Sequence, residues 1–587
     1  MNKWHKLTSL MLAAVLCISL LSQASAIMSF SKNEVLPHNK ISDSLANKLQ
    51  SGENVKTTAM VWLSDIDMQT VEKEALSICA MNTDSVERGI LTDESLSRLD
   101  VQEYIESKRA VAAEYYRKQN TQIASTLFTS EDIVFISEYS PVILVKVTAS
   151  TAIAAAQSEN VTFLDYCDET KSEDTPSLIP ASTQKEVYKT LEMVNEITRV
   201  TDVHDSSAFG YTGNGVKIGI IEKNLPTPSN FENLSLTLHS PWEWGTDTEH
   251  ADAVLSIISS IAPDAEYYAA SYLYNDAEIL LPRIEWLLNQ GVNVINSSRG
   301  LSDNADAYDA IAKWIDHIAY QHDVHFVQAT GNTSAEIESA AMSYNAVAVG
   351  NIDIGKAMTT MDDFVIATGS GRNNTELYAY KPDLCAPGKT FTILSLDNYP
   401  CNGTSFAAPQ VTGVIALLCE QNINLRTSQT AVKAILTASV NFDYDKCLVP
   451  SETEYRAYGA GLLDCLGACW VAGNYRFVSA SLSSNTHSAT HSFTVTSSDS
   501  KIRVSLAYNM QSVASGSHGV GNIVVGTFRD LDLIVRDPNG NEVDRSATTR
   551  NNVEIVEFEP TMNGTYTIEV RRGDSSTEAL WYGLAWR

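Results

Sequence analysis

A serine stands at the start of a long apolar segment in the second half of the sequence. Ser405 lies in the segment 402–409 (NGTSFAAP), and residues 411–420 are mostly apolar. This pattern predicts a buried helix that begins close to Ser405, with Pro409 in its first turn, where the missing N–H costs nothing. Unpaired N–H groups and the positive end of the helix dipole would then surround the serine. Ser405 is therefore either a nucleophile or an ordinary N-cap of a core helix.

The residues from about 200 to 470 alternate between short β-branched runs and helical segments. This alternation is typical of an α/β fold, in which a parallel sheet is covered by helices on both faces. In such a sheet, ligands bind beyond the carboxyl ends of the strands. The pattern predicts strands at 216–221, 266–271, 292–296, 324–329 and 346–350, and helices at 250–261, 277–290 and 305–321.

Polar residues come at or just past the ends of three expected strands. They are Glu222, Ser298 and Asn332, so these side chains should meet at one edge of the sheet, and Ser405 should face the same edge. His250 begins an expected helix directly after a loop. Because a neutral serine hydroxyl needs a base to take its proton, this set indicates nucleophilic catalysis with His250 as the base. A structural histidine and a turn asparagine are the alternatives for His250 and Asn332.

The segment around Ser405 (GTSFAAP, residues 403–409) resembles the nucleophile segment of the subtilisin-like serine proteases, or subtilases. Further segments resemble other motifs of that family, in the family's order, over about residues 200–467. They are 211–222 (YTGNGVKIGIIE), like the first strand, which normally ends in Asp; 249–254 (EHADAV), in the place of the histidine signature; 294–300 (VINSSRG), like the strand that binds substrate backbone; 329–332 (ATGN), like the oxyanion asparagine; and 381–388 (KPDLCAPG), like the approach to the serine. The resemblance implies the subtilisin-like fold.

The resemblance also implies a serine endopeptidase that acts on protein or peptide substrates. Ser405 would be the nucleophile, and His250 would take its proton and later give it to the leaving amine. Glu222 would hold the imidazole tautomer and stabilise its charged form. The side chain of Asn332 and the backbone N–H of Ser405 would bind the oxyanion.

Substrate binding is implied for Ser298, Arg299 and Gly300. Arg299 stands where the family mostly has a small or apolar residue. One hypothesis is that this arginine biases the site toward acidic side chains of the substrate. The alternative is an arginine that faces solvent or pairs with a local acid.

The sequence departs from the family pattern at two places. Glu222 replaces Asp and adds one methylene, so its carboxylate must reach the histidine through a different rotamer; the alternative is an inert or salt-bridging glutamate. The motif of His250 has lost the glycine, threonine and second histidine that normally follow. Asp252 adds a charge there, which would raise the pKa of His250 or make Asp252 a substitute orienting group. Asp247, on the preceding loop, is a further candidate acid.

The N-terminus predicts export. Lys3 and Lys6 precede an apolar run at 10–21, and residues 24–26 (ASA) offer a small-residue cleavage site. Residues 1–26 are therefore expected to be a signal peptide, and the protein to be secreted and extracellular.

Residues 27–180 are expected to form an α+β domain. Strands are predicted at 57–63, 142–147 and 161–166, and a long helix at about 93–126. The end of this domain resembles subtilase propeptides, which act as folding aids and intramolecular inhibitors, so the resemblance implies a zymogen. The long helix departs from the short family pattern, and an unrelated N-terminal domain is the alternative. The polar stretch 169–185 is expected to be a linker with a processing site.

The catalytic domain is expected to span residues 181–470, and a C-terminal β-sandwich of the jelly-roll-like kind to span 471–587. Strands are predicted at 476–482, 491–496, 502–508, 531–535, 553–558 and 564–571. A structural calcium at Asp530 or Asp532 is one interpretation of the acids there, and solvated turn acids are the favoured one.

Composition limits the partners. A formal net charge of -30 over 587 residues argues against binding of nucleic acid. No zinc-site spacing occurs, so no cofactor is predicted with certainty. No segment after the signal has the length of a membrane span, so no membrane association is expected once the signal is removed. Of nine cysteines, all but Cys17 remain after signal removal, and their pairing cannot be deduced from sequence.

Several functions compete. A secreted serine endopeptidase made as a zymogen is favoured, because Ser405, Asn332 and His250 are all present. The alternative is a catalytically impaired pseudoprotease or binding scaffold, as Glu222 and the altered histidine motif would suit decay. An adhesion protein ranks low without an anchor or repeat, and an α/β-hydrolase lipase would need a Gly-x-Ser-x-Gly elbow that the α/β region lacks.

Overall fold

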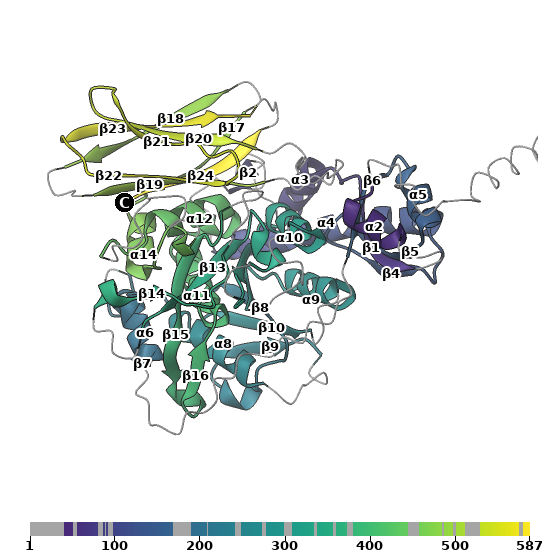
Figure 1. The fold of residues 1–587 in the computed structure, drawn as a ribbon, viewed down its shortest axis with the longest axis horizontal. Helices are drawn as coiled ribbons and strands as arrows, with labels where there is room; N and C mark the ends of the chain where they lie inside the picture. The colour runs from purple at the N-terminus through teal and green to yellow at the C-terminus, as the bar shows by residue number, and fades with distance from the viewer. Residues whose placement is uncertain are drawn as a thin grey trace, which may run out of the picture.

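The structure is a computed structural model in which three parts follow one another along the chain (Figure 1). They are an N-terminal α+β region, a central α/β part and a C-terminal β part. The expected signal peptide and most of the expected linker lie outside the described residues. The structure describes residues 40–50, 56–79, 86–87, 90–91, 98–167, 189–207, 209–240, 248–272, 277–298, 308–333, 337–355, 360–372, 380–443, 457–483, 486–496, 501–510, 529–574 and 579–587.

The central part is built on one sheet with the strand order β16-β15-β13-β12-β11-β8-β10-β9. Neighbours pair in parallel from β9 to β15, and the edge strand β16 runs antiparallel to β15. The predicted parallel sheet and its five predicted strands are confirmed, whereas β9, β15 and β16 were not predicted. The strands are β8 (Lys217–Glu222), β9 (Ser235–Leu238), β10 (Glu266–Ser271), β11 (Val294–Ser297), β12 (His325–Ala329), β13 (Val347–Asp353), β15 (Leu384–Ile393) and β16 (Tyr399–Asn402).

Helices cover both faces of this sheet. Along β11, Val294 packs on the side of α8 and α11, whereas Ile295 packs on the side of α9 and α10. Successive residues of a strand point to opposite faces of the sheet. Because both faces are buried, the strands are apolar throughout. The helices are α8 (Glu249–Ile261), α9 (Ala277–Asn289), α10 (Ala310–Gln321), α11 (Ala408–Gln421), α12 (Gln429–Ala438) and α14 (Cys465–Gly473).

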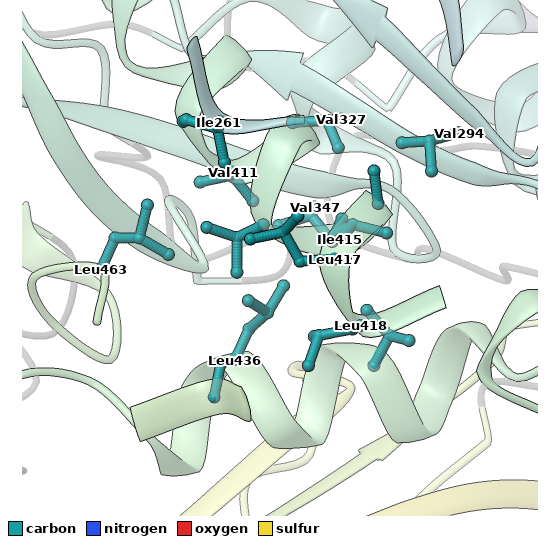
Figure 2. Packing of buried hydrophobic residues seen from close by; sticks show 14 of the residues in the cluster. Ile261, Val294, Val327, Val347, Val411, Ile415, Leu417, Leu418, Leu436 and Leu463 are labelled. Atoms are coloured by element: carbon teal, nitrogen blue, oxygen red, sulfur yellow. The ribbon is translucent and has the colours of Figure 1, made fainter. Parts of the chain in front are cut away.

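The helix after Ser405, α11, is buried on all sides, as its apolar circumference predicts. Gly413 allows α8 to approach, because a Cβ on it would lie 2.7 Å from the Cβ of Ile261. Such tight packing fixes the turn that precedes the helix. Figure 2 shows the cluster around it, which includes Val411, Ile415, Leu417 and Leu418 of α11, Val294, Val327 and Val347 of the sheet, and Leu436 of α12.

The N-terminal region is an antiparallel sheet with the order β4-β5-β1-β6, flanked by helices. It packs on the central part beside α9 and α10 (Figure 1), where Trp62 and Phe163 belong to the same hydrophobic cluster as Trp314 of α10. The ranges predicted for β1, β5 and β6 are confirmed. Its elements are α2 (Asp43–Gln50), β1 (Thr57–Leu63), α3 (Met68–Ile78), β2 (Val86–Glu87), β3 (Ile90–Leu91), α4 (Arg98–Leu127), β4 (Ile133–Ile136), β5 (Val142–Val147), α5 (Ala149–Ala156) and β6 (Val161–Tyr166).

The C-terminal part consists of two antiparallel sheets, β17-β24-β19-β22 and β18-β23-β20-β21, which confirms the predicted β-sandwich. It is joined to the central part by buried hydrogen bonds: the amide of Asn345 donates to the backbone oxygen of Met510 and accepts from its N–H, each at 2.8 Å. The strands β21 and β24 were not predicted. The strands are β17 (Phe477–Leu482), β18 (Ser488–Val495), β19 (Ile502–Tyr508), β20 (Leu531–Arg536), β21 (Glu542–Ser546), β22 (Val553–Phe558), β23 (Gly564–Arg572) and β24 (Leu580–Trp586).

Within the ranges described above, no helix combines the length and the apolar character that crossing a bilayer requires. Over the same ranges, no three His, Cys, Asp or Glu side chains gather as metal ligands. Asp532, one of the acids considered for calcium, instead pairs with Arg571 at 2.7 Å. Among the residues that the structure describes, no two cysteines are joined by a disulfide.

Candidate active site

The carboxylate of Glu222 contacts the ring of His250 at the carboxyl edge of the sheet. Glu222 is the last residue of β8, and His250 stands in the first turn of α8. The Nδ1 atom of His250 lies 3.0 Å from Oε2 of Glu222, whose side chain is 2% exposed. The additional methylene of glutamate therefore still allows a hydrogen bond. A buried carboxylate in this position fixes the tautomer with a proton on Nδ1 and stabilises the imidazolium.

Ser405 lies in a tight turn between β16 and α11. The turn is the 3₁₀ helix η6 (Thr404–Phe406), and the N-cap of α11 is Ala407, which makes no side-chain capping bond. Ser405 is therefore not the N-cap of this helix. The ring of Phe406 lies 5.2 Å from the ring of His250, so the serine turn and the histidine helix are in contact. The catalytic assignment predicts a hydrogen bond from the Ser405 hydroxyl to the His250 ring.

Asn332 lies against the same turn from the end of β12. Its Oδ1 atom accepts from the backbone N–H of Thr404 at 2.9 Å and from the Thr404 hydroxyl at 3.3 Å. With its oxygen engaged in this way, the amide NH₂ is the group left to donate to a substrate oxygen. Gly403 permits the approach, because a Cβ there would lie 3.3 Å from the amide atoms of Asn332. Asn332, which was predicted for the oxyanion hole, thus contacts the residue next to Ser405.

The end of β11 is held to α11 by a short chain of hydrogen bonds. The amide of Asn296 donates to Ser298 Oγ at 2.8 Å and accepts from the Thr412 hydroxyl at 2.9 Å. Asn296 and Thr412 were not singled out from the sequence, although an asparagine inside an apolar strand was a signal for such a role. Arg299 and Gly300 lie outside the described residues.

Asp252 does not orient the histidine. Its Oδ1 accepts from the backbone N–H of Thr227 at 2.5 Å, and its Oδ2 accepts from the amide of Asn230 at 2.9 Å. Burial raises the pKa of this carboxyl group, and the hydrogen bonds from Thr227 oppose that rise. The expectation that Asp252 substitutes as the orienting group is therefore wrong, because its oxygens hold the turn at 227–230. Asp247 lies outside the described residues.

Two family models match the chain. Residues 245–461 match the model of the subtilase family, and residues 487–572 match that of the bacterial pre-peptidase C-terminal domain. The first match begins after Glu222, so it includes His250, Asn332 and Ser405 but not the glutamate.

The chain is also similar to curated proteins and to solved structures. The chain is 28% identical over 235 residues to subtilisin BL of Lederbergia lenta, which covers 36% of this chain and 79% of that protein. It is 28% identical to the M-protease of Shouchella clausii, of which it spans 56%. Among solved structures, it is similar to the prenylagaramide maturation protease PagA (22% identity, TM-score 0.36, 48% of this chain and 97% of that one). It is also similar to fervidolysin of Fervidobacterium pennivorans, a keratinolytic enzyme related to subtilisin (14% identity, TM-score 0.41, 90% and 88%).

A parallel sheet whose carboxyl edge brings a serine turn, a histidine and an asparagine together is the framework of a serine-type endopeptidase, and the sequence matches agree with that class. Within that class, residues 245–461 are similar to the subtilase family.

Proposed function

We propose that the protein hydrolyses peptide bonds through a triad of Ser405, His250 and Glu222. His250 takes the proton of the Ser405 hydroxyl, and the oxygen attacks the substrate carbonyl. The resulting oxyanion is held by the amide of Asn332 and the N–H of Ser405. His250 then protonates the leaving amine, and a water molecule activated by the same imidazole hydrolyses the acyl-enzyme.

The observation that carries this proposal is the 3.0 Å contact between His250 Nδ1 and Glu222 Oε2. An inert glutamate would have no reason to be buried against the imidazole of a histidine that also contacts the serine turn. This contact favours an active enzyme over a catalytically impaired scaffold. Although Glu222 replaces the usual Asp, its carboxylate still reaches the imidazole of His250.

Substrate binding is proposed for the end of β11 and the residues that follow it. In sequence, Ser298, Arg299 and Gly300 follow β11, and the neighbouring strand β12 leads to Asn332. A substrate backbone that runs beside this segment would deliver its carbonyl to the oxyanion donors. The preference of Arg299 for acidic side chains stays a prediction, which cleavage of a peptide library would test; no acidic enrichment at any subsite would discard it.

We further propose that the protein is exported and made as a zymogen. The signal sequence at 1–26 supports secretion, and the position of the N-terminal α+β region, 27–180, before the catalytic domain, 181–470, supports the role of a propeptide. The polar stretch 169–185 would contain the processing site. The C-terminal β-sandwich, 471–587, is proposed as the third domain after these two.

Labelling with a fluorophosphonate probe tests the activity directly. The processed protein is expected to be labelled, and Ser405→Ala cut within 169–185 to show no labelling, because the probe reacts only with a serine activated by a neighbouring base. Ser428→Ala is a matched control, since Ser428 is buried near the C-terminal sheets and bonds to Ser479 at 2.8 Å. Equal labelling of the wild type and Ser405→Ala would show that another residue is the nucleophile.

A further inference from the structure

A second acidic side chain lies beside the residue proposed for the oxyanion hole, and the proposed reaction does not use it. Glu338 directly precedes the short 3₁₀ helix η3 (Ser339–Met342), and its side chain makes no capping bond to that helix. A Cβ on Gly331 would lie 2.5 Å from Cγ of Glu338 and 2.9 Å from its Oε1. The carboxylate therefore lies against Gly331, the residue directly before Asn332.

The approach of this carboxylate requires glycine at position 331. The φ of Gly331 is 95°, a conformation that glycine adopts readily, and any side chain there would collide with Glu338. The N–H of Gly331 donates to the Thr404 hydroxyl at 3.1 Å, and its oxygen accepts from the N–H of Gly371 at 2.8 Å. The backbone under the carboxylate is thus fixed to the serine turn.

The backbone of Glu338 is also fixed. Its N–H donates to the oxygen of Thr330 at 3.1 Å, and its oxygen accepts from the N–H of Ala341 at 2.9 Å. The residues of η3 are buried, and Met342 belongs to the same hydrophobic cluster as Ile337. Glu338 itself is partly exposed. A carboxylate that is accessible and held on a rigid backbone can bind a charged group of a ligand at little cost in ordering.

The proposed attack determines which part of a substrate comes near this carboxylate. The attacked carbonyl must lie at the amide of Asn332, which is exposed, and the same substrate residue carries its side chain one carbon away from that carbonyl. Because consecutive Cα atoms are about 3.8 Å apart, the carboxylate against Gly331 lies within roughly 8 Å of the Cα of Asn332. A long side chain spans such a distance, and a short one does not.

We infer that Glu338 selects substrates in which the residue that supplies the attacked carbonyl is arginine or lysine. The inference rests on the proposed function and names its substrate class. The cation of the substrate pairs with the Glu338 carboxylate while the carbonyl oxygen binds the amide of Asn332. Arginine is preferred to lysine, because its planar group matches a carboxylate through two hydrogen bonds. An acidic side chain would be repelled, and an apolar one would desolvate the carboxylate without offering it a charge.

Two peptide substrates that differ in one group test the inference without altering the protein. They share their sequence and their fluorogenic leaving group, but one has arginine before the scissile bond and the other has citrulline, the uncharged analogue of arginine. The processed protein is expected to cleave the arginine substrate with a kcat/KM about 10–100-fold higher, as for a hydrogen bond between charged groups. Equal values for the two substrates would overturn the inference.

Glu338→Gln tests whether this residue is the source of the preference. The amide keeps the size of the side chain and removes its charge, so the ratio of the two kcat/KM values should fall to about 1. Glu232→Gln is the matched control, because Glu232 is an exposed glutamate of the central part, and this variant should keep the wild-type ratio. The wild-type ratio in Glu338→Gln would assign the preference to another residue. If Glu338→Gln does not fold, the two substrates still decide with the unaltered protein.

Arg299→Ala distinguishes a cation of the substrate from a cation of the protein. The preference for arginine should be present in the wild type and persist in Arg299→Ala. A preference that appears only in Arg299→Ala would mean that this arginine occupies the carboxylate in the wild type, and would overturn the inference.

Binding to the inactive protein separates this inference from the proposed function. Ser405→Ala cut within 169–185 is titrated with the arginine and citrulline peptides, and the arginine peptide is expected to bind about 10-fold more tightly or better. Such binding, with no turnover and no fluorophosphonate labelling of the wild type, would keep Glu338 as a specificity residue and refute the activity. Labelling of the wild type with equal binding of the two peptides would do the reverse.

Discussion

The two edges of the central sheet are built in different ways. At the carboxyl edge, the side chain of His250 is 23% exposed, and one carboxylate, Glu222, holds it. At the amino edge, Arg109 is 1% exposed, and its guanidinium is surrounded by carbonyl oxygens. Groups that must exchange partners during a reaction are left accessible, whereas groups that hold two parts of a molecule together are saturated.

This difference leads to opposite expectations for substitutions at the two edges. Changes at the carboxyl edge should lower turnover and leave the association of the N-terminal region intact. Changes at the amino edge should weaken that association and leave turnover intact. A substitution that lowered both turnover and the association of the N-terminal region would contradict this difference between the two edges.

The largest effect is expected for Glu222→Gln. The amide keeps the size of the side chain but removes the charge that stabilises the imidazolium, so kcat should fall by about 10³–10⁴-fold. Glu222→Asp keeps the charge, so its kcat should fall less than that of Glu222→Gln. Turnover of a fluorogenic peptide measures both, and the melting temperature serves as the control. Undiminished activity of Glu222→Gln would leave only Ser405 and His250 as the catalytic pair.

Asn332→Ala should have the next largest effect on turnover. Loss of one oxyanion donor lowers kcat by about 10²–10³-fold and leaves KM nearly unchanged, because the donor acts on the transition state. The same peptide substrate gives both constants. A rise in KM at constant kcat would instead assign Asn332 to ground-state binding.

At the amino edge, Lys108→Met should destabilise the assembly without affecting turnover. It leaves Asp323 buried without its lysine, which costs about 3–5 kcal/mol for a buried pair that loses one partner. Urea titration of the full chain measures the loss, with the exposed Lys118→Met on the same helix as control. Replacing both partners, as in Lys108→Met with Asp323→Asn, should recover part of the stability, because asparagine is neutral and tolerates the positive φ of 49° at this position. A lower kcat in Lys108→Met would show that the two edges are coupled.

The smallest effect is a pH dependence that originates at Glu285 of α9. Burial raises the pKa of this carboxyl group to about 8, although it accepts hydrogen bonds from the Ser137 hydroxyl and from the Glu138 N–H. The pKa of Glu285 is higher in the folded protein than its ordinary value. The contribution of this group to stability is therefore fully present below about pH 4.5 and is lost as the pH rises through about 8. The slope from one proton is at most about 1.4 kcal/mol per pH unit.

Glu285→Gln should therefore remove the fall in the free energy of unfolding of the full chain between about pH 6.5 and 8, whereas the exposed Glu131→Gln should not. Burial lowers the pKa values of His317 and His322, so these groups destabilise the fold only as the pH falls below their ordinary range. Urea titration of the full chain across this pH range is the measurement. The same slope in wild type and Glu285→Gln would place the titrating group elsewhere.

The sequence predicts best what depends on local pattern. Apolar runs such as those of β10 and β19 match the observed strands to the residue. The strand β15 (Leu384–Ile393) was missed, because Pro387 and Gly388 interrupt it and such residues are unusual inside strands. The strand β24 (Leu580–Trp586) was missed because its residues do not alternate: all of them are buried.

Motif spacing predicted that Glu222, His250, Asn332 and Ser405 would share one edge, since parallel strands end together. It could not predict the partners of Asp252, which lie in a turn more than twenty residues earlier in the chain. Nor could it distinguish Arg109 from the exposed arginine at 117, because both look like surface positions of a charged helix. Contacts of this kind depend on the packing of distant segments, which helical periodicity does not encode.

The buried cysteine of α11 has a consequence for how the protein responds to oxidants. Cys419 is fully buried, and burial raises the pKa of its thiol to about 12, so the reactive thiolate is scarce at neutral pH. Hydrogen peroxide should therefore leave Cys419 unmodified while the central part stays folded, and modification of this thiol would report that the core around α11 has opened.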